Sequence, residues 1–436
     1  MYKVLYGQEF IAQYHDTSFY MLTNYSEYQC KLQLVDGLNI PRLNIYSTGL
    51  RFINFLNISK CINYTTKNRT GYIRKVIIPL DALVYIRKKN FQANMLFLEP
   101  RVLLSKFEAW NNKTYCKQAV KQNGLALQYV KEQTEEIILE AVKQNGLALQ
   151  YVKEQNQTEE IMLEAVKQNG FTLKYIRKQN QIEHICLQAV KQNGLSLYYV
   201  IEQTEQICLQ AVKQNGLSLE RVKNQTEQLC LEAVKQNGFA LEFVKNQTEQ
   251  LCLEAVKQNG FALEFVKNQT EHICLEAVKQ YGLSLSYMKE EIKSEYICLE
   301  AVKQDGYALQ YVNKQTNEIC LHAVKQNGFS FRFVEKQNQT EQIYLEAVKQ
   351  YGNVLYFMKE KTLTEQIYLE AVKQNGLSLC YVIEQTKKIC KRAIQQNGLA
   401  LEFVKPQFQT EQICKLAIQQ NSLALKYIHN ITKSKN

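Results

Sequence analysis

The chain has 436 residues, a hydrophobic fraction of 46% and a formal net charge of +11. This hydrophobic fraction is ordinary for a folded soluble protein. No stretch approaches the ~18 unbroken apolar residues of a membrane span, so we expect no membrane partner. The N-terminus lacks a basic region followed by an apolar core, so we expect no signal peptide and predict a cytoplasmic protein.

The first quarter of the chain contains no repeat. Its β-branched and aromatic runs are typical of short strands, and we predict a small α+β domain over residues 1–108. Residues 1–109 carry 14 Lys and Arg against 7 Asp and Glu. This excess would attract nucleic acid more readily than the nearly balanced remainder. The runs are Tyr2–Tyr6, Phe19–Thr23, Tyr72–Ile78 and Leu83–Ile86.

Residues 109–436 are built from copies of one short unit, and Trp110 at the junction is expected to seal the first of them. Fourteen copies follow one another in steps of 22 or 24 residues. A fixed period of this size is typical of a solenoid, in which each unit buries its apolar face against its neighbours. The predicted fold class is therefore mostly α, an α-solenoid of about 14 helix-turn-helix units. The repeat glycines are Gly124, Gly146, Gly170, Gly194, Gly216, Gly238, Gly260, Gly282, Gly306, Gly328, Gly352, Gly376 and Gly398, with Ser422 in the last copy.

One unit, residues 134–155, illustrates the pattern. Thr134 is a good helix N-cap, and Lys143 lies where a helix C-terminus favours a cation. Gly146 suits the left-handed position that ends many helices. Each unit is thus predicted to hold a helix of about 11 residues, a glycine turn and a second helix of about 8.

Two columns of residues point to packing inside the array. Alanine stands five residues before the glycine position in all fourteen units, which predicts a close approach between helices. Cysteine stands eight residues before it in ten units, and Ile, Met or Tyr in the other four. A slot that accepts these residues is an apolar one, where free cysteine acts as a small hydrophobe. We therefore predict a structural cysteine column and a reducing compartment.

A column of lysines forms the candidate binding surface. Twelve units carry Lys three residues before the glycine, and all fourteen carry Gln next to it. A regular line of cations could follow a phosphate backbone. The simpler interpretation is that Lys complements a helix C-terminus and that Gln is solvated, while Glu one turn earlier partly cancels the charge. The candidates are Lys121, Lys143, Lys167, Lys191, Lys213, Lys235, Lys257, Lys279, Lys303, Lys325, Lys349 and Lys373.

The amino-acid sequence of the repeat resembles that of a known family. Ile273–Gly282, together with Phe261–Val266, is similar to a short helical repeat of unknown function found in giant, mimivirus-like viruses of amoebae. Gly71–Tyr85 resembles the leader segment before such arrays, although Thr48–Phe52 departs at two positions from the stretch that often precedes it. The resemblance implies a virus-encoded repeat protein in the host cell cytoplasm. It implies no activity and no catalytic residues.

The remaining polar residues show no catalytic or metal-binding pattern. The histidines have no metal-ligand or triad spacing, and the glycines read as helix stops rather than as a phosphate-binding loop. We expect no cofactor, no metal and no catalytic residue, and we interpret His184, His272 and His322 as surface groups. The five histidines are His15, His184, His272, His322 and His429.

These observations favour a non-enzymatic protein-interaction or scaffold protein that binds an extended protein partner on the solenoid surface. One alternative is binding of RNA or another nucleic acid through the Lys–Gln column and the basic N-terminal region. The other is an enzyme confined to residues 1–108, with His15 or Asp81 in its site and the solenoid as a targeting arm. The last unit keeps Leu423 and Leu425 and is only partly capped, which favours end-to-end self-association.

Overall fold

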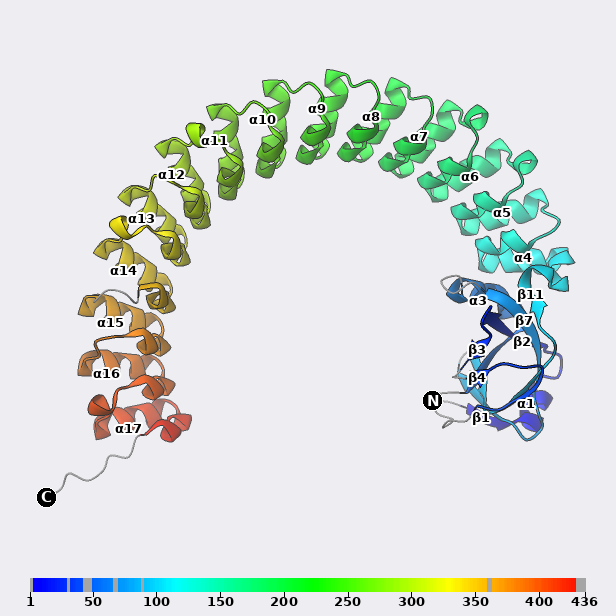
Figure 1. Ribbon diagram of the computed structural model, residues 1–436, viewed down its shortest axis with the longest axis horizontal. Helices are drawn as coiled ribbons and strands as arrows, with labels where there is room; N and C mark the ends of the chain where they lie inside the picture. Colours follow the sequence, from blue (N-terminus) through cyan, green and yellow to red (C-terminus); the bar gives the residue numbers. More distant parts are fainter. Residues whose placement is uncertain are drawn as a thin grey trace. The chain divides into compact units, whose positions relative to one another are not determined.

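The computed structural model describes residues 3–29, 32–41, 49–65, 70–87, 90–358 and 363–428. Residues 1–222 and 223–436 form two compact units. The first holds an antiparallel sheet followed by helical repeats, and the second holds repeats only (Figure 1). The predicted fold class, a series of helical repeats behind a small α+β domain, is confirmed.

Antiparallel strands make up most of the N-terminal part of the first unit. They are β1 (Lys3–Tyr6), β2 (Phe19–Asn24), β3 (Tyr28–Gln29), β4 (Leu32–Gln33), β5 (Gly37–Asn39), β6 (Leu50–Asn54), β7 (Thr70–Ile77), β8 (Leu83–Arg87), β9 (Asn90–Ala93), β10 (Leu96–Leu98) and β11 (Val102–Leu103). The sheet order is β1-β8-β9-β6-β2-β7-β10-β5, with β11 paired to β7, while β3 and β4 form a hairpin. The β-branched and aromatic runs of the sequence lie in β1, β2 and β7, and the apolar stretch that begins at Leu83 lies in β8.

Aromatic side chains fill the core of this sheet domain. Helix α1 (Gly7–Gln13) contributes Phe10, which is fully buried against Phe19, Phe52 and Phe91. The ring centroids of Phe10 and Phe91 are 5.4 Å apart in an edge-to-face arrangement, a favoured geometry for aromatic pairs. The alternation of buried and half-buried residues along β2 places one face of that strand in this core.

Trp110 closes the junction between the sheet and the repeats, as predicted. It lies in the short 3-10 helix η4 (Glu108–Asn111), after η3 (Leu104–Lys106), and is 1% exposed. Its indole Nε1 donates to the Leu104 carbonyl oxygen at 2.8 Å, and its ring stacks on Tyr129 with centroids 5.3 Å apart. The buried indole is therefore both packed and hydrogen-bonded.

Helix α3 (Ile58–Thr65), which follows η1 (Phe55–Asn57), caps the first repeat. The Ser59 hydroxyl donates to the Gln122 side chain at 2.9 Å, and the Asn123 amide donates to the Ser59 carbonyl oxygen at 2.9 Å. The rings of Phe55 and Tyr115 pack with centroids 4.6 Å apart. The N-terminal domain thus supplies the polar and apolar partners that a preceding repeat would otherwise provide.

Each repeat consists of a ten-residue α-helix and a short 3-10 helix that lie side by side (Figure 1). In the first unit the pairs are α4 (Lys113–Gln122) with η5 (Gly124–Tyr129), α5 (Glu135–Gln144) with η6 (Gly146–Tyr151), α6 (Glu159–Gln168) with η8 (Gly170–Tyr175), α7 (Glu183–Gln192) with η10 (Gly194–Tyr199), and α8 (Glu205–Gln214) with η11 (Gly216–Arg221).

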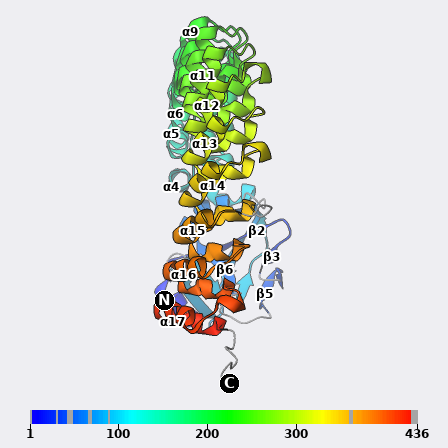
Figure 2. The same ribbon diagram turned by 90° about the vertical axis from the view of Figure 1, so that its left-hand side faces the viewer.

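The second unit continues the same pairing, and Figure 2 shows its helices α15, α16 and α17 one beside the next. The pairs are α9 (Glu227–Gln236) with η12 (Gly238–Phe243), α10 (Glu249–Gln258) with η13 (Gly260–Phe265), α11 (Glu271–Gln280) with η14 (Gly282–Tyr287), α12 (Glu295–Gln304) with η16 (Gly306–Tyr311), α13 (Asn317–Gln326) with η17 (Gly328–Phe333), α14 (Glu341–Gln350) with η19 (Gly352–Met358), α15 (Glu365–Gln374) with η20 (Gly376–Tyr381), α16 (Lys387–Gln396) with η21 (Gly398–Phe403), and α17 (Glu411–Gln420) with η23 (Ser422–Tyr427).

The second helix of each repeat differs from the predicted second helix in type and in length. It is a 3-10 helix, six residues long in every repeat except η19, which has seven. Asn145 and Val152, at its two ends in one repeat, are both extended and leave room for only this short segment. A run this short is typical of the tighter helix, whose i to i+3 bonds begin with Ala148 N–H to the Asn145 carbonyl oxygen at 2.8 Å.

The predicted left-handed conformation of the repeat glycines is wrong. Among the described residues, Gly37 in the sheet domain is the only glycine with a positive φ. The repeat glycines are needed for close approach instead. A Cβ placed on Gly260 would lie 2.5 Å from the Ala277 carbonyl oxygen of the next repeat and 2.9 Å from the Ser284 hydroxyl. The close approach predicted from the alanine column therefore exists, and the first residue of the 3-10 helix makes it against the next repeat.

The 24-residue steps carry their extra residues in the linkers, as predicted. In each described linker of this length a short 3-10 turn precedes the next α-helix. An added turn changes the connection without displacing the packed helices, which is where insertions are tolerated best. These turns are η7 (Glu154–Asn156), η9 (Lys178–Asn180), η15 (Glu290–Ile292), η18 (Lys336–Asn338) and η22 (Pro406–Phe408).

Candidate interaction surface

All twelve lysines of the candidate column are exposed in the last turn of their α-helices, and four of them form an ion pair with a glutamate one turn earlier. Lys279 lies 2.9 Å from Glu276, and the same spacing recurs at Lys303, Lys349 and Lys373. The hydrogen bond and charge of Glu276 raise the pKa of Lys279, so the pair stays ionised. A lysine paired in this way is a weaker contact for a phosphate, so these pairs interrupt the line of free cations along the column.

The glutamine next to each lysine joins neighbouring repeats, so the prediction that it is merely solvated is wrong. Its side-chain oxygen accepts the glycine N–H of the preceding repeat at 2.5–2.7 Å in ten described pairs. In one repeat the Gln304 oxygen accepts from Gly282, while its amide donates to the Gln280 carbonyl oxygen at 3.1 Å. The glutamine therefore satisfies polar groups at the end of the preceding α-helix.

A second set of glutamines joins repeats at the opposite end of the α-helix. Gln225 donates to the Phe243 carbonyl oxygen at 2.8 Å and accepts the Lys245 N–H at 3.1 Å. At the equivalent place Lys293 donates its ammonium to the Tyr311 carbonyl oxygen at 3.1 Å. These bonds run from one repeat to the next, so both glutamine columns serve the stacking and neither needs an external ligand.

The residues that flank each glycine form a surface that we call the turn surface. It consists of the glutamine two residues before the glycine, the residue directly before it and the apolar residue directly after it. The residue before it is usually Asn, whose side chain caps the 3-10 helix, as where Asn145 accepts the Leu147 N–H at 3.0 Å. This surface therefore places amide groups beside half-buried apolar side chains in most repeats.

Two hollows open on the turn surface of the second unit. The larger, about 320 Å³, is lined by residues of four successive repeats, among them Phe261, Tyr281, Asp305, Tyr307 and Asn327. The smaller, about 260 Å³, is lined by Phe329, Tyr351, Asn353, Gln374 and Asn375, among others. Both mix aromatic rings with amide side chains, and the larger one runs along the repeats rather than into the core.

A tyrosine replaces the usual asparagine at each hollow. Tyr281 is 45% exposed and stacks on Phe261 with ring centroids 5.0 Å apart and an interplanar angle of 9°. Tyr351 is 42% exposed and packs on Phe329 with centroids 4.5 Å apart. The sequence analysis missed both residues, although their departure from asparagine at one repeat position is visible in the sequence.

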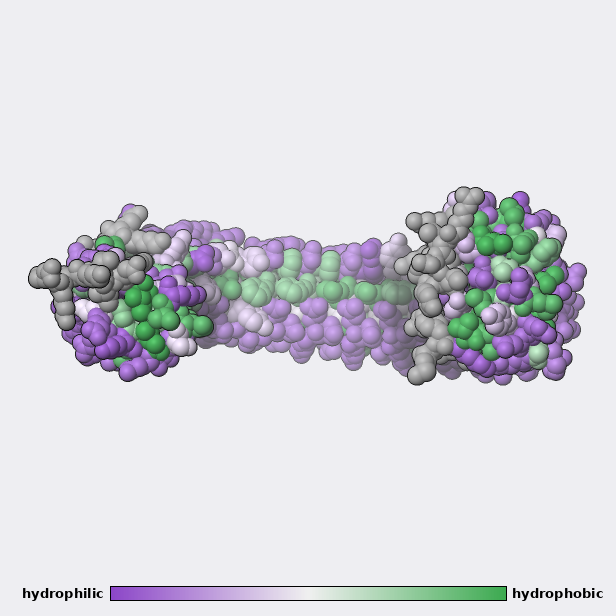
Figure 3. Space-filling model, turned by 90° about the horizontal axis from the view of Figure 1, so that it is seen from below, coloured by the Kyte–Doolittle hydropathy of each residue, from purple (hydrophilic) through white to green (hydrophobic). Residues whose placement is uncertain are grey.

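Apolar side chains gather in a band along the repeats, with hydrophilic surface on both sides (Figure 3). Two columns of half-buried apolar residues recur at the repeat period, one directly after the glycine and one seven residues before it. Ring contacts such as Phe239 with Phe265, at 6.0 Å, link one repeat to the next. Exposed apolar side chains in a continuous row favour contact with another molecule.

Helix α16 departs from the repeat in charge. Its four residues Lys387, Lys388, Lys391 and Arg392 are exposed, where the preceding α15 carries Glu, Gln, Leu and Glu. Among the described residues the only ion pair of this group joins Lys388 to Glu365 at 3.9 Å. Lys387 and Lys388 lie in the first turn of α16, where cations oppose the helix dipole, so the helix gains no dipole stabilisation from these two charges.

The cysteine column is buried. Its ten thiols, none of them in a disulfide, are at most 4% exposed. Burial raises the pKa of Cys186, Cys274 and Cys390 to about 11 and that of Cys320 to about 12. Because the thiolate is the reactive form, these cysteines are chemically inert near neutral pH.

We expect thiol reagents to distinguish the buried column from the other cysteines. In the native chain near neutral pH, the exposed Cys380 should react rapidly and the half-buried Cys61 more slowly. The ten column thiols should react only after unfolding in guanidinium, which exposes all 13 cysteines. Rapid modification of Cys230 or Cys252 in the folded chain would contradict the packing described here.

The histidines stand apart from one another. His15 lies 3.2 Å from Asp16, and both side chains are at least 75% exposed. His184 lies 2.8 Å from Glu159 and is half exposed. The surface location predicted for the repeat histidines is confirmed for His184 and His272, which are exposed, while His322 is half-buried and His429 lies outside the described residues. Over the described ranges no three His, Cys, Asp or Glu side chains are grouped so that they could hold a metal ion.

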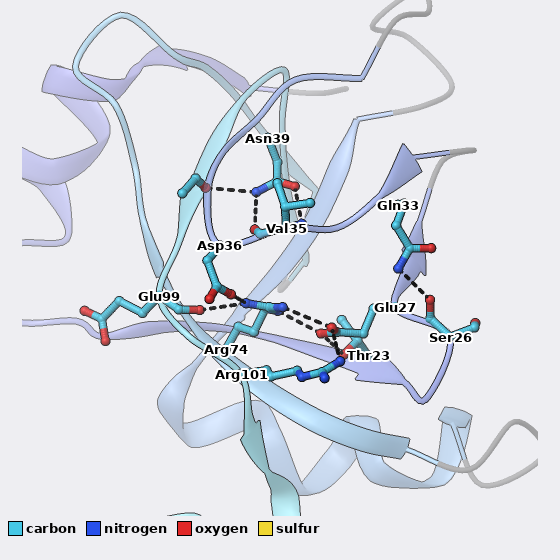
Figure 4. Close-up of polar contacts among 11 residues, drawn as sticks. Thr23, Ser26, Glu27, Gln33, Val35, Asp36, Asn39, Arg74, Glu99 and Arg101 are labelled. Atoms are coloured by element: carbon cyan, nitrogen blue, oxygen red, sulfur yellow. Dashed lines mark hydrogen bonds and ion pairs between the residues drawn. The ribbon is translucent and has the colours of Figure 1, made fainter.

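A buried ion cluster ties the sheet domain together (Figure 4). The Arg74 guanidinium, 3% exposed, donates to both carboxylate oxygens of Glu27 at 2.8 and 3.0 Å, to Asp36 at 2.5 Å and to the Glu99 carbonyl oxygen at 2.9 Å. Burial raises the pKa of Glu27, but the hydrogen bonds and charges of Arg74 and Arg101 outweigh it and hold that pKa below its ordinary value. Each charged side chain of this cluster is paired with an opposite charge, so we interpret the cluster as structural.

A protein-family model described as "Domain of unknown function (DUF4116)" matches the chain in ten segments. They are residues 112–157, 134–181, 183–226, 204–248, 226–271, 248–293, 270–315, 294–338, 340–385 and 386–433. No curated protein matches the chain. In the part of the chain that the structure describes, no helix is both long and apolar enough to cross a bilayer.

Proposed function

Because the chain belongs to the DUF4116 family, whose description names no activity, we propose its function from the geometry: it is a non-enzymatic scaffold that binds an extended protein segment along the turn surface. The observation that carries this proposal is the pair of hollows at Tyr281 and Tyr351. Repeat arrays of this kind offer long surfaces suited to extended partners.

The shape of the larger hollow supports an extended polypeptide. It is lined by four successive repeats, and packed helices lie about 8–10 Å apart. A polypeptide in an extended or polyproline conformation rises about 3.1–3.4 Å per residue. Three residues of such a segment therefore span about one repeat, so every third side chain would meet an equivalent place on the turn surface.

The chemistry of the hollows fits the same partner. Rings such as Phe261 and Tyr281 offer apolar contact area at low entropic cost, and tyrosine is enriched at the centres of protein interfaces. Asn327 presents an amide side chain beside them. Amides match the N–H and C=O groups that an extended backbone leaves unpaired. The viral source and the cytoplasmic location expected from the sequence stay predictions.

Restoring asparagine at both hollows should abolish most of the binding without unfolding the chain. Asn is the usual residue at this position and caps the 3-10 helix in other repeats, so Tyr281→Asn together with Tyr351→Asn removes the rings and introduces a residue that the fold accepts there. We expect peptides selected by the full chain from a displayed random library to bind the double variant at least ~10-fold more weakly, because buried aromatic anchors contribute about 1–2 kcal/mol or more each.

The control is Tyr296→Gln on α12, which removes an exposed tyrosine that lines neither hollow. Its dissociation constant, measured by fluorescence anisotropy, should equal that of the unaltered chain. Equal binding by the double variant and the unaltered chain would contradict the proposed role of the turn surface.

A polyanion such as RNA is the second candidate partner, and α16 rather than the lysine column favours it. We expect single-stranded RNA to bind the full chain with a salt dependence that weakens when the residues of α15 are copied onto α16 as Lys387→Glu, Lys388→Gln, Lys391→Leu and Arg392→Glu. Loss of four phosphate contacts should lower the slope of log affinity against log salt by about 3. An unchanged slope would rule out α16 as the binding site.

A further inference from the structure

The larger hollow is lined by three residues that differ from the usual repeat sequence and lie in neighbouring repeats. Tyr281 and Asp305 stand directly before their glycines, where most units have Asn, and Tyr307 stands directly after one, where most have Leu or Phe. All three line the same hollow. Two consecutive copies elsewhere, residues 229–249 and 251–271, are identical, so a concentration of changes at one place marks a site with its own requirement.

Asp305 is the only acidic residue in the column directly before the repeat glycines. Its Oδ1 accepts the Tyr307 N–H at 2.9 Å, which fixes the carboxylate at the start of η16. The neighbouring column lysines are engaged elsewhere, since Lys279 pairs with Glu276 and Lys303 with Glu300. Over the described ranges no ion pair joins Asp305 to a cation.

The rings beside this carboxylate suit a cation as well. Tyr281 stacks on Phe261 on one side and contributes to the hollow, and Tyr307 packs edge-on against Phe333 with centroids 6.1 Å apart. Aromatic faces attract ammonium and guanidinium groups, and a carboxylate beside them adds a charge-assisted hydrogen bond. The hollow, about 320 Å³, is large enough for a long side chain.

From these observations we propose that the hollow at Tyr281, Asp305 and Tyr307 binds the cationic side chain of a lysine or arginine in the extended protein segment. This inference rests on the proposed function and names the chemistry of its partner. Because the other turn-surface positions repeat about every three partner residues, the basic side chain also sets the register in which the segment lies along the array.

The test uses nonapeptides selected by the full chain from a displayed random library. We expect Lys or Arg to be enriched at one position, and the selected peptide to bind about tenfold more tightly than its counterpart with Gln there, by fluorescence anisotropy. Asp305→Asn restores the usual residue and keeps the helix cap, so folding is preserved. In this variant the two peptides should bind equally.

Two further variants separate the rings from the charge. Tyr307→Phe keeps the ring and should keep the preference for the basic peptide, whereas Tyr307→Leu should reduce it. Selection of peptides without enrichment of Lys or Arg, or an undiminished preference in Asp305→Asn, would overturn the proposed cation site and leave the scaffold function standing. Failure of the unaltered chain to select any peptide would instead overturn the scaffold function and this site together.

Discussion

Replacement of Arg74 by methionine should lower the free energy of unfolding of the sheet domain by about 3–5 kcal/mol. The change removes the guanidinium that holds both oxygens of Glu27 and leaves a buried carboxylate whose other side-chain contacts are Arg101, at 3.0 Å, and the Thr23 hydroxyl, at 3.3 Å. Desolvated charges without partners are among the most destabilising features of a protein interior. Chemical denaturation followed by the fluorescence of Trp110, the only tryptophan, would measure the loss.

The matched control and the pH dependence make this prediction specific. Arg101→Met removes a cation that is 53% exposed, so its effect should stay below about 1 kcal/mol.

Because the folded state holds the pKa of Glu27 below its ordinary value, the stabilisation is complete above that ordinary value and is lost as the pH falls through the folded-state pKa. The difference between Arg74→Met and the unaltered chain should therefore shrink on acidification. A constant difference would contradict the role given to Glu27.

Replacement of Gly260 by alanine should destabilise the second unit by about 3 kcal/mol, at the upper end of what overpacking costs. The added methyl would lie 2.5 Å from the Ala277 carbonyl oxygen, a backbone atom that cannot move away without shifting a whole repeat. The usual gain from replacing glycine by alanine in a helix, about 0.5–1 kcal/mol, is smaller than this clash. Guanidinium denaturation followed by circular dichroism would measure the change.

The last repeat provides the control for the glycine prediction. Ser422 occupies the glycine position there, and no described residue packs beyond it as Ala277 does beyond Gly260. Ser422→Ala should therefore leave the denaturation midpoint unchanged within about 0.5 kcal/mol. If Gly260→Ala were equally well tolerated, the close approach between successive repeats would not determine the residue at this position.

The sequence predicts those features that depend on a single repeat or on a local sequence pattern. The period of 22 or 24 residues, the α-helix, the buried cysteine slot and four of the strands all follow from local periodicity and residue type. The roles of Gly260 and Gln304 do not, because each depends on an atom of the adjacent repeat. The 3-10 helix escaped prediction because its apolar spacing also fits one α-helical turn.

The buried ion cluster and the candidate site could not be predicted from the sequence for a different reason. Arg74 is a charged residue, and charged residues are rarely buried unless they are paired. Its partner Glu27 lies 47 positions away, and the strand pairing that brings them together cannot be read from local periodicity. Tyr281 and Asp305 are visible as departures from the repeat, but only the stacking of repeats places them in one hollow.

The bonds between repeats also bear on how such an array gains and loses length. Gly238 bonds Gln258, and Gln225 bonds Phe243, so each partner is an equivalent residue of the following copy. Unequal recombination between the identical segments 229–249 and 251–271 would delete or add one whole copy. The repeats that become neighbours would then form every such bond at their new junction. Copy number can therefore drift during evolution with little penalty in foldability, and the distance between Tyr281 and any site N-terminal to the exchange would change in steps of one repeat.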